Sequence, residues 1–201
     1  MNEAWKQRLL ESGEHLIHIE CDNQGSDQIR DCLLAVSPLG IVRRQEAFYE
    51  DMKTAEYLRF FASLFRSALP IQSVMETMRL STLARTPIEK LDYSQRRRLA
   101  IAREILHQAP VLWIEEPLLN LDESSRAVIL AWLEQAVSTK IITTTVSLKL
   151  LYLLPGVGYT LDQGSLVKLE NEADAFQPHA CGKIPVKLED KILVFDPQEI
   201  D

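Results

Sequence analysis

The stretch that decides the fold is residues 111–122, "VLWIEEPLLNLD". It opens on four apolar residues of the kind that form a strand buried on both faces of a sheet. Glu115 and Glu116 follow directly, and Asp122 is placed to cap a helix over residues 124–137. A strand that delivers carboxylates in this way is typical of a magnesium-nucleotide site, which also needs a phosphate-binding loop earlier in the chain.

The spacing of apolar residues predicts the elements around this stretch. The expected strands are 14–20 and 140–145, with a hairpin over 158–170 that turns near Gln163 and Gly164. The expected helices are 29–36, 54–68, 71–80, 94–108 with Ser94 as its cap, and 148–154, while residues 21–28 are expected to form a turn-rich loop. Buried strands separated by helices indicate an α/β layered fold with a mostly parallel sheet.

Composition narrows the class of protein. The chain has 201 residues, 46% of them hydrophobic, and a net charge of -7, which predicts one main domain and argues against coating nucleic acid or an anionic membrane by charge alone. Cys21, Cys32 and Cys181 form no CxxC pair, so we expect reduced, inert thiols. The N-terminus lacks an apolar signal core and no apolar run could span a bilayer. We therefore expect a cytoplasmic protein with no membrane insertion.

Two longer segments carry a family resemblance. "IVRRQEAFYEDMKTAEYL" (41–58) and "LDYSQRRRLAIAREILHQAPVLWIEEPLLNLD" (91–122) resemble the nucleotide-binding domain of ABC transporters. The first is similar to the Q-loop, and the second to the signature helix, the Walker B strand and the D-loop in their usual order. "LDQGSLVKL" (161–169) resembles the strand pair that ends that domain. The resemblance implies a P-loop NTPase fold with a helical subdomain over residues 1–170.

The phosphate-binding loop of that family is missing. No G-x-x-x-x-G-K-[ST] motif occurs in the chain, and the segment in its place is "CDNQGSDQI". On the resemblance Gly25 is retained, Ser26 replaces the lysine and Asp27 replaces the hydroxyl residue, with Asp22 nearby. A carboxylate facing a triphosphate is unfavourable by about 1 to 4 kcal/mol. The segment is also short, so we expect the loop to be largely deleted.

Two further parts of the catalytic apparatus differ from the family. The signature, normally Leu-Ser-Gly-Gly-Gln, is Leu91-Asp92-Tyr93-Ser94-Gln95, in which side chains obstruct the approach of a phosphate. Val146 stands near the position of the switch histidine and cannot transfer a proton. Glu115 replaces the Walker B aspartate, whereas Glu116 retains the position of the catalytic base. We therefore expect a pseudo-ATPase without catalytic residues, in which Glu116 is vestigial and ATP with magnesium binds weakly or not at all.

The vestigial nucleotide site has six residues on this resemblance: Gly25, Gln45, Gln95, Glu115, Glu116 and Asp122. Gln45 is expected to serve as a structural loop residue. The run Arg96–Arg98 is expected to lie on a solvated helix face with structural pairing, and not to bind nucleic acid. His15 and His18 have no evident metal-binding partners, so no metal site is expected.

The end of the chain carries a second resemblance. Residues 171–183 have the composition of a linker, and "KIPVKLEDKILVFDPQEID" (183–201) resembles the opening strands of LytTR-type DNA-binding domains. Strands are expected at 184–188 and 192–194. The pattern stops at Asp201, so residues 184–201 are expected to begin a domain whose DNA-contacting residues lie outside this sequence.

Two functions follow from these resemblances. The first is a non-catalytic, ABC-like dimerisation or sensing domain of a bacterial transcriptional regulator. Such a protein would form a homodimer, bind DNA through a LytTR domain and bind a protein partner. The second is a degenerate nucleotide-binding subunit of an ABC transporter, paired with an active ATPase subunit and coupled to membrane helices.

Overall fold

The computed structural model describes Trp5 and residues 7–35, 38–162, 164–169, 184–188 and 191–195. The chain divides into two compact units, Met1–Lys168 and Leu169–Asp201. In the second unit, β7 (Ile184–Leu188) pairs antiparallel with β8 (Lys191–Phe195), so the two strands expected there are confirmed. The expected linker lies outside the described residues.

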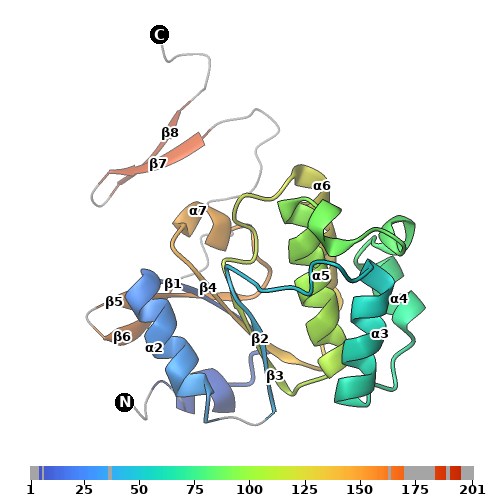
Figure 1. Ribbon diagram of the computed structural model, residues 1–201. Coiled ribbons are helices and arrows are strands. Elements are labelled where there is room, and N and C mark those ends of the chain that lie inside the picture. The colour runs from blue at the N-terminus through green and yellow to red at the C-terminus, as the bar shows by residue number, and fades with distance from the viewer. Residues whose placement is uncertain are drawn as a thin grey trace. The chain divides into compact units, whose positions relative to one another are not determined.

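The first unit is built on a six-stranded sheet (Figure 1). Its order is β2-β3-β4-β1-β5-β6, with β2 at Leu39–Val42, β3 at Val111–Glu115, β4 at Lys140–Thr145, β1 at Leu16–Glu20, β5 at Val157–Asp162 and β6 at Ser165–Lys168. All neighbours are parallel except β5 and β6, which form the expected hairpin. The predicted α/β fold with a mostly parallel sheet is confirmed.

Helices cover both faces of this sheet. They are η1 (Gln7–Glu11), α2 (Asn23–Leu33), α3 (Thr54–Phe65), α4 (Ile71–Thr77), η2 (Ser81–Leu83), η3 (Ile88–Lys90), α5 (Tyr93–His107), α6 (Glu123–Gln135) and α7 (Leu148–Leu151). Side chains alternate between two cores along β3: Val111 and Trp113 pack with η1 and α2, whereas Leu112 and Ile114 pack with α3 to α6. A strand that is apolar throughout is therefore buried on both faces, as its composition predicts.

Two local predictions are wrong. The segment expected to be a loop over 21–28 is mostly helical, because Asp22 caps α2 and its carboxylate accepts the Gly25 N–H at 2.7 Å. The cap of α5 is Asp92 and not Ser94, with Gln95 completing a capping box. In both α2 and α5, the capping aspartate places the start of the helix before the first residue at which the spacing of apolar residues predicts a helix.

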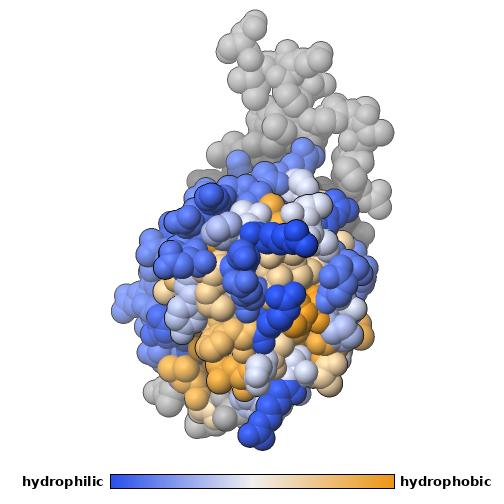
Figure 2. Space-filling model, turned by 45° about the vertical axis from the view of Figure 1, so that its right-hand side comes forward, coloured by the Kyte–Doolittle hydropathy of each residue, from blue (hydrophilic) through white to orange (hydrophobic). Residues whose placement is uncertain are grey.

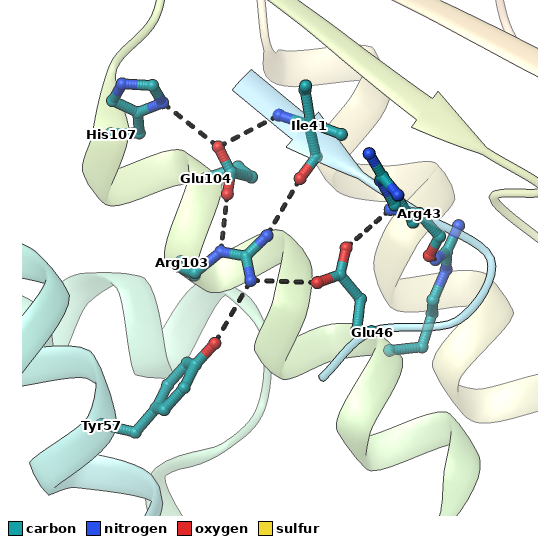
Figure 3. A network of polar contacts seen from close by, with 8 residues as sticks. Ile41, Arg43, Glu46, Tyr57, Arg103, Glu104 and His107 are labelled. Carbon is teal, nitrogen blue, oxygen red and sulfur yellow. Dashed lines mark hydrogen bonds and ion pairs between the residues drawn. The ribbon is translucent and has the colours of Figure 1, made fainter. Parts of the chain in front are cut away.

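Strand β2 was not predicted, because side chains of α5 stabilise its free edge. Glu104 accepts the Ile41 N–H at 3.3 Å, and Arg103 donates to the Ile41 carbonyl at 2.9 Å (Figure 3). Arg103 also pairs with Glu46 at 3.0 Å and with Glu104 at 2.6 Å. Burial by itself lowers the pKa of Arg103, but the carboxylates of Glu104 and Glu46 outweigh it, so the net pKa lies above the ordinary value. This edge is therefore paired with side chains and closed to other strands.

His18 lies in the middle of β1 and is 1% exposed. Its Nδ1 lies 2.8 Å from the Thr143 hydroxyl, and its Nε2 donates to the Pro155 carbonyl. Burial lowers the pKa of His18 to about 4, although the bond to Pro155 opposes the shift. The folded protein therefore holds this imidazole neutral at pH values where the unfolded chain would protonate it.

This difference predicts a loss of stability in acid. Between the unfolded pKa of about 6.5 and the folded pKa of about 4, the unfolded chain binds more protons, so the free energy of unfolding falls as the pH falls, by about 3 kcal/mol in total. Urea denaturation at pH 7 and pH 4.5 measures the effect. His18→Gln should reduce the difference between the two pH values, whereas His15→Gln, an exposed neighbour, should not. Equal pH dependence in His18→Gln and the unchanged chain would contradict the assignment.

Candidate functional site

The candidate site lies at the carboxyl ends of β1, β3 and β4. These strands are parallel neighbours, with Glu20 opposite Thr145 and Glu115 opposite Thr144, so their ends meet at one edge of the sheet. Ligands in open α/β sheets bind at this edge. The structure therefore brings the vestigial carboxylates to the place where a nucleotide site would be.

The connection from β1 to α2 consists of Cys21 and Asp22 alone. A phosphate-binding loop requires several residues whose N–H groups surround the phosphates. The Asp22 carboxylate accepts the N–H of Gly25, the third residue of the helix, and Ser26 is buried with its hydroxyl 2.8 Å from that of Thr144. Asp27 pairs with Arg30 on the exposed side of α2 and does not face the site. The connection between β1 and α2 is thus two residues long, and the predicted deletion of the loop stays a prediction.

Gly25 is explained by packing. A Cβ atom at this position would lie 2.7 Å from the Leu161 side chain and 2.9 Å from Cys21 Cβ. The first turn of α2 can therefore approach β5 only if this residue lacks a side chain. The glycine assigned to the vestigial site thus has a structural reason that involves no phosphate.

The edge of the sheet is strongly acidic. Burial raises the pKa of the Cys21 thiol to about 12, with further contributions from the carboxylates of Asp22, Glu20, Glu116 and Glu115. The same charges oppose the binding of any anion near Cys21. Cys21 and Cys32 are both buried, and neither forms a disulfide bond.

Glu116 is held in place by the end of β4. It is 3% exposed, with a φ of 50°, and its N–H donates to the Thr144 carbonyl at 2.7 Å. Its carboxylate accepts the Thr145 hydroxyl at 2.9 Å and the Val146 N–H at 2.8 Å. Val146, at the expected position of the switch histidine, therefore contributes a backbone hydrogen bond. Two of the acceptor positions of the Glu116 carboxylate are thus occupied within the chain.

Glu115 and Gln45 are less constrained. The Glu115 carboxylate is partly exposed and accepts the Arg44 N–H at 2.9 Å, which ties the end of β3 to the segment that follows β2. Gln45, the next residue, is exposed. The structure thus brings Glu115 next to the segment that contains Gln45, with the glutamine side chain on the surface.

Arg97 connects these strand ends to α5. It is 4% exposed and donates to the carbonyls of Arg43 and Glu115, and at 3.1 Å to that of Glu116. Burial lowers the pKa of Arg97, and the nearby ring of Tyr93 and the carboxylates oppose the shift. The expected solvated face for this arginine is wrong, because its partners are main-chain carbonyls inside the protein. Its neighbour Arg96 instead pairs with Glu50 at the surface.

The remaining predicted residues meet at the start of α5. Asp92 accepts the Gln95 N–H at 2.8 Å and Gln95 accepts the Asp92 N–H at 3.2 Å, so both side chains are used in capping. Ser94 is buried and accepts the Asp122 N–H at 3.1 Å. The pKa of Asp122 is lowered to about 2, first by the Ser125 N–H and second by the Ser94 hydroxyl. Asp122 caps α6, as predicted from the sequence.

The arrangement contains groups that were not predicted from the sequence. Thr145 and Arg97 support Glu116 from two sides, and neither residue type signals this role by its spacing. Within the described ranges, no three His, Cys, Asp or Glu side chains are grouped so that they could hold a metal ion. Among the helices that the structure describes, none is both long and apolar enough to cross a membrane.

Comparisons with known sequences identify transport ATP-binding proteins. No family model matches the chain. It is 37% identical over 82 residues to the cytochrome c biogenesis ATP-binding export protein CcmA of Paracoccus denitrificans, which is 41% of this chain and 39% of that protein. It is 25% identical over 148 residues to the linearmycin resistance ATP-binding protein LnrL of Bacillus subtilis, which is 70% of this chain and 47% of that protein. The chain spans less than half the length of these relatives.

Solved structures show the same fold. An ABC transporter of the metal-chelate type, in an inward-facing conformation, matches 90% of this chain and 84% of its own chain with a TM-score of 0.66 and 15% identity. The ATP-binding subunit of an ABC transporter matches 79% of this chain and 80% of its own with a TM-score of 0.65 and 16% identity. The chain is therefore similar in sequence to transport ATP-binding proteins, and it shares its fold with solved structures of ABC transporter ATP-binding chains. The comparisons support this part of the predicted resemblance and not the LytTR part.

The outcome for a single supporting contact can be predicted. Arg97→Met should lower the free energy of unfolding by about 3 kcal/mol, because buried carbonyls lose a charged donor. Arg96→Met, which removes a partly exposed ion pair with Glu50 and a hydrogen bond to the Leu91 carbonyl, should cost only about 1 kcal/mol. Chemical denaturation of the two variants tests this difference. Similar losses for both would show that the buried contacts of Arg97 do not stabilise the sheet edge.

Proposed function

We propose that this chain is a nucleotide-binding-type subunit of an ABC transport system that neither hydrolyses ATP nor binds it tightly. It would act as a structural partner of an active ATPase subunit and of membrane helices. The comparisons favour a subunit of this class over the transcriptional regulator expected first, since the relatives are described as ATP-binding proteins of export and resistance.

One observation carries the loss of activity. Both helix N-termini that the family resemblance assigns to phosphate are capped by a carboxylate of this chain, α2 by Asp22 and α5 by Asp92. A helix N-terminus attracts anions because its N–H groups are free and its dipole is positive. Here one N–H group at each helix start, that of Gly25 or Gln95, is bonded to the capping carboxylate, which carries the same sign of charge as a phosphate. A nucleotide would have to displace or face these aspartates.

A hydrophobic surface supports docking to membrane helices. Tyr49 is 56% exposed, Phe60 is 45% exposed and Leu64 is 62% exposed. We call these three residues the exposed hydrophobic surface. Figure 2 shows hydrophobic side chains gathered among charged ones on the side that carries α3. The ring of Tyr49 meets that of Phe60 edge-on, with centroids 5.8 Å apart, and Phe60 meets Phe61 in the same way at 5.2 Å. Exposed, ordered aromatic groups of this kind are typical of protein interfaces.

The nucleotide prediction is tested by calorimetry. Titration of the chain with ATP and magnesium, and with ADP as a control, should give no binding tighter than about 100 μM, equivalent to roughly -5.5 kcal/mol. Asp22→Asn and Asp92→Asn, which keep a capping oxygen and remove the charge, should leave ATP hydrolysis absent. Turnover of ATP that is abolished by Glu116→Gln would refute the proposal, because it would show that the ancestral base still acts.

The transport assignment has a separate test. In cells that express the chain at its native level, we expect it to sediment with membranes and to be cross-linked to a transmembrane protein through a photoreactive residue at Phe60. Leu64→Asp should reduce both signals, whereas Val137→Asp, which changes a residue that is 73% exposed on another part of the surface, should not. A chain that stays out of the membrane fraction and binds promoter DNA in full length would favour the regulator instead.

A further inference from the structure

We propose that a cavity between α4, α5 and α6 binds a small amphiphilic amine, that is, a single ammonium group on a compact aromatic or aliphatic body. The cavity has a volume of about 510 Å³, within the usual range of small-molecule sites. It is independent of the nucleotide site. Its lining includes the last turns of α5 and α6 and the start of β3, whereas the vestigial site lies at their opposite ends.

The walls of the cavity suit an apolar body. Val74 from α4, Ile105 from α5, Leu112 from β3 and Trp132 from α6 provide hydrocarbon and indole surface from four elements. Trp132 is partly exposed, so its indole can stack on a flat ligand. Hydroxyl and amide side chains complete the lining at Ser73, Thr77, Gln108, Gln135, Ser138 and Thr139.

The charge of the lining determines the polar end of the ligand. Glu104 is the one ionisable residue among those that line the cavity, and it is 7% exposed. Among the described residues that line the cavity there is no lysine or arginine, so an anionic ligand would meet no cation from them. A cation would lie in a partly buried region, where charges interact more strongly than in water.

The ion pairs around Glu104 leave one negative charge when the neighbouring His107 is neutral. Arg103 is shared between two carboxylates, those of Glu104 at 2.6 Å and Glu46 at 3.0 Å, so this group of three carries a net charge of -1 (Figure 3). Glu104 accepts from Arg103 on one oxygen and from the Ile41 N–H and His107 on the other. A carboxylate has about four acceptor positions, so Oε1 can accept one more donor. An ammonium group supplies that donor and the missing positive charge.

The experiment compares two ligands that differ in charge. Tryptamine and its neutral analogue, 2-(indol-3-yl)ethanol, are titrated calorimetrically into the full chain at pH 7. We expect tryptamine to bind at least about tenfold tighter than the alcohol, since a charge-assisted hydrogen bond replaces a neutral one. Glu104→Gln should bring the two affinities within about twofold of each other. Glu134→Gln, which neutralises an exposed residue of α6 that does not line the cavity, should preserve the difference.

A second variant tests the proposal even if the Glu104→Gln protein does not fold. Ser138 is exposed and lines the cavity, so Ser138→Trp places a large side chain at the opening without disturbing the core and should abolish tryptamine binding. The proposal is overturned if the alcohol binds as tightly as tryptamine, if Ser138→Trp leaves binding unchanged, if Glu134→Gln has the effect of Glu104→Gln, or if neither ligand produces heat.

Discussion

The sheet edge that carries the candidate site depends on the buried guanidinium of Arg97. One side chain from α5 holds the carbonyls at the end of β3 and the one that follows β2. The bond to the Glu116 carbonyl is buried and the other two are partly buried, so loss of Arg97 would leave a buried carbonyl without this donor, at a cost of about 1 to 3 kcal/mol. The same contacts hold Glu116 in its left-handed conformation, from which its carboxylate reaches the end of β4. The ancestral geometry is therefore kept by internal bonds and needs no nucleotide.

Internal carboxylates also replace the ligand at the helix ends. A domain that binds ATP gains stability from it in proportion to the logarithm of ligand concentration over Kd. A domain that has lost the ligand must satisfy the same N–H groups by itself, and a capping aspartate contributes about 1 kcal/mol at each helix. Asp22 and Asp92 do this at α2 and α5. On the proposed loss of phosphate binding, the two aspartates that oppose phosphate would also stabilise the fold without nucleotide.

Much of this could be predicted from the sequence, and the failures share a physical cause. The apolar run before Glu115 predicts a strand buried on both faces, and Asp122 predicts the start of the next helix. Both predictions succeed because they depend on local sequence alone. Strand β2 gives no such signal, since it is short and its edge is stabilised by Arg103 and Glu104, more than sixty residues later. Arg97 is charged, and a charged residue is normally expected at the surface. Its partners are carbonyls at distant strand ends, which the local sequence does not indicate. Strand β2 and the burial of Arg97 both depend on contacts between segments far apart in the sequence. The spacing of apolar residues along the chain cannot predict such contacts.

A network around Arg103 links α3 to the sheet edge and so supports the proposed docking surface. Arg103 donates to the Tyr57 hydroxyl at 3.3 Å while it pairs with Glu46 (Figure 3). Tyr57 also packs on Phe61, with ring centroids 4.7 Å apart. Helix α3, helix α5 and the segment after β2 therefore meet at one guanidinium. In an active subunit of the proposed kind, nucleotide would order the segment after β2. Here Arg97 and Arg103 hold this segment through Arg43 and Glu46. The exposed hydrophobic surface is therefore fixed relative to the sheet by contacts within the chain. A structural partner requires such a fixed surface.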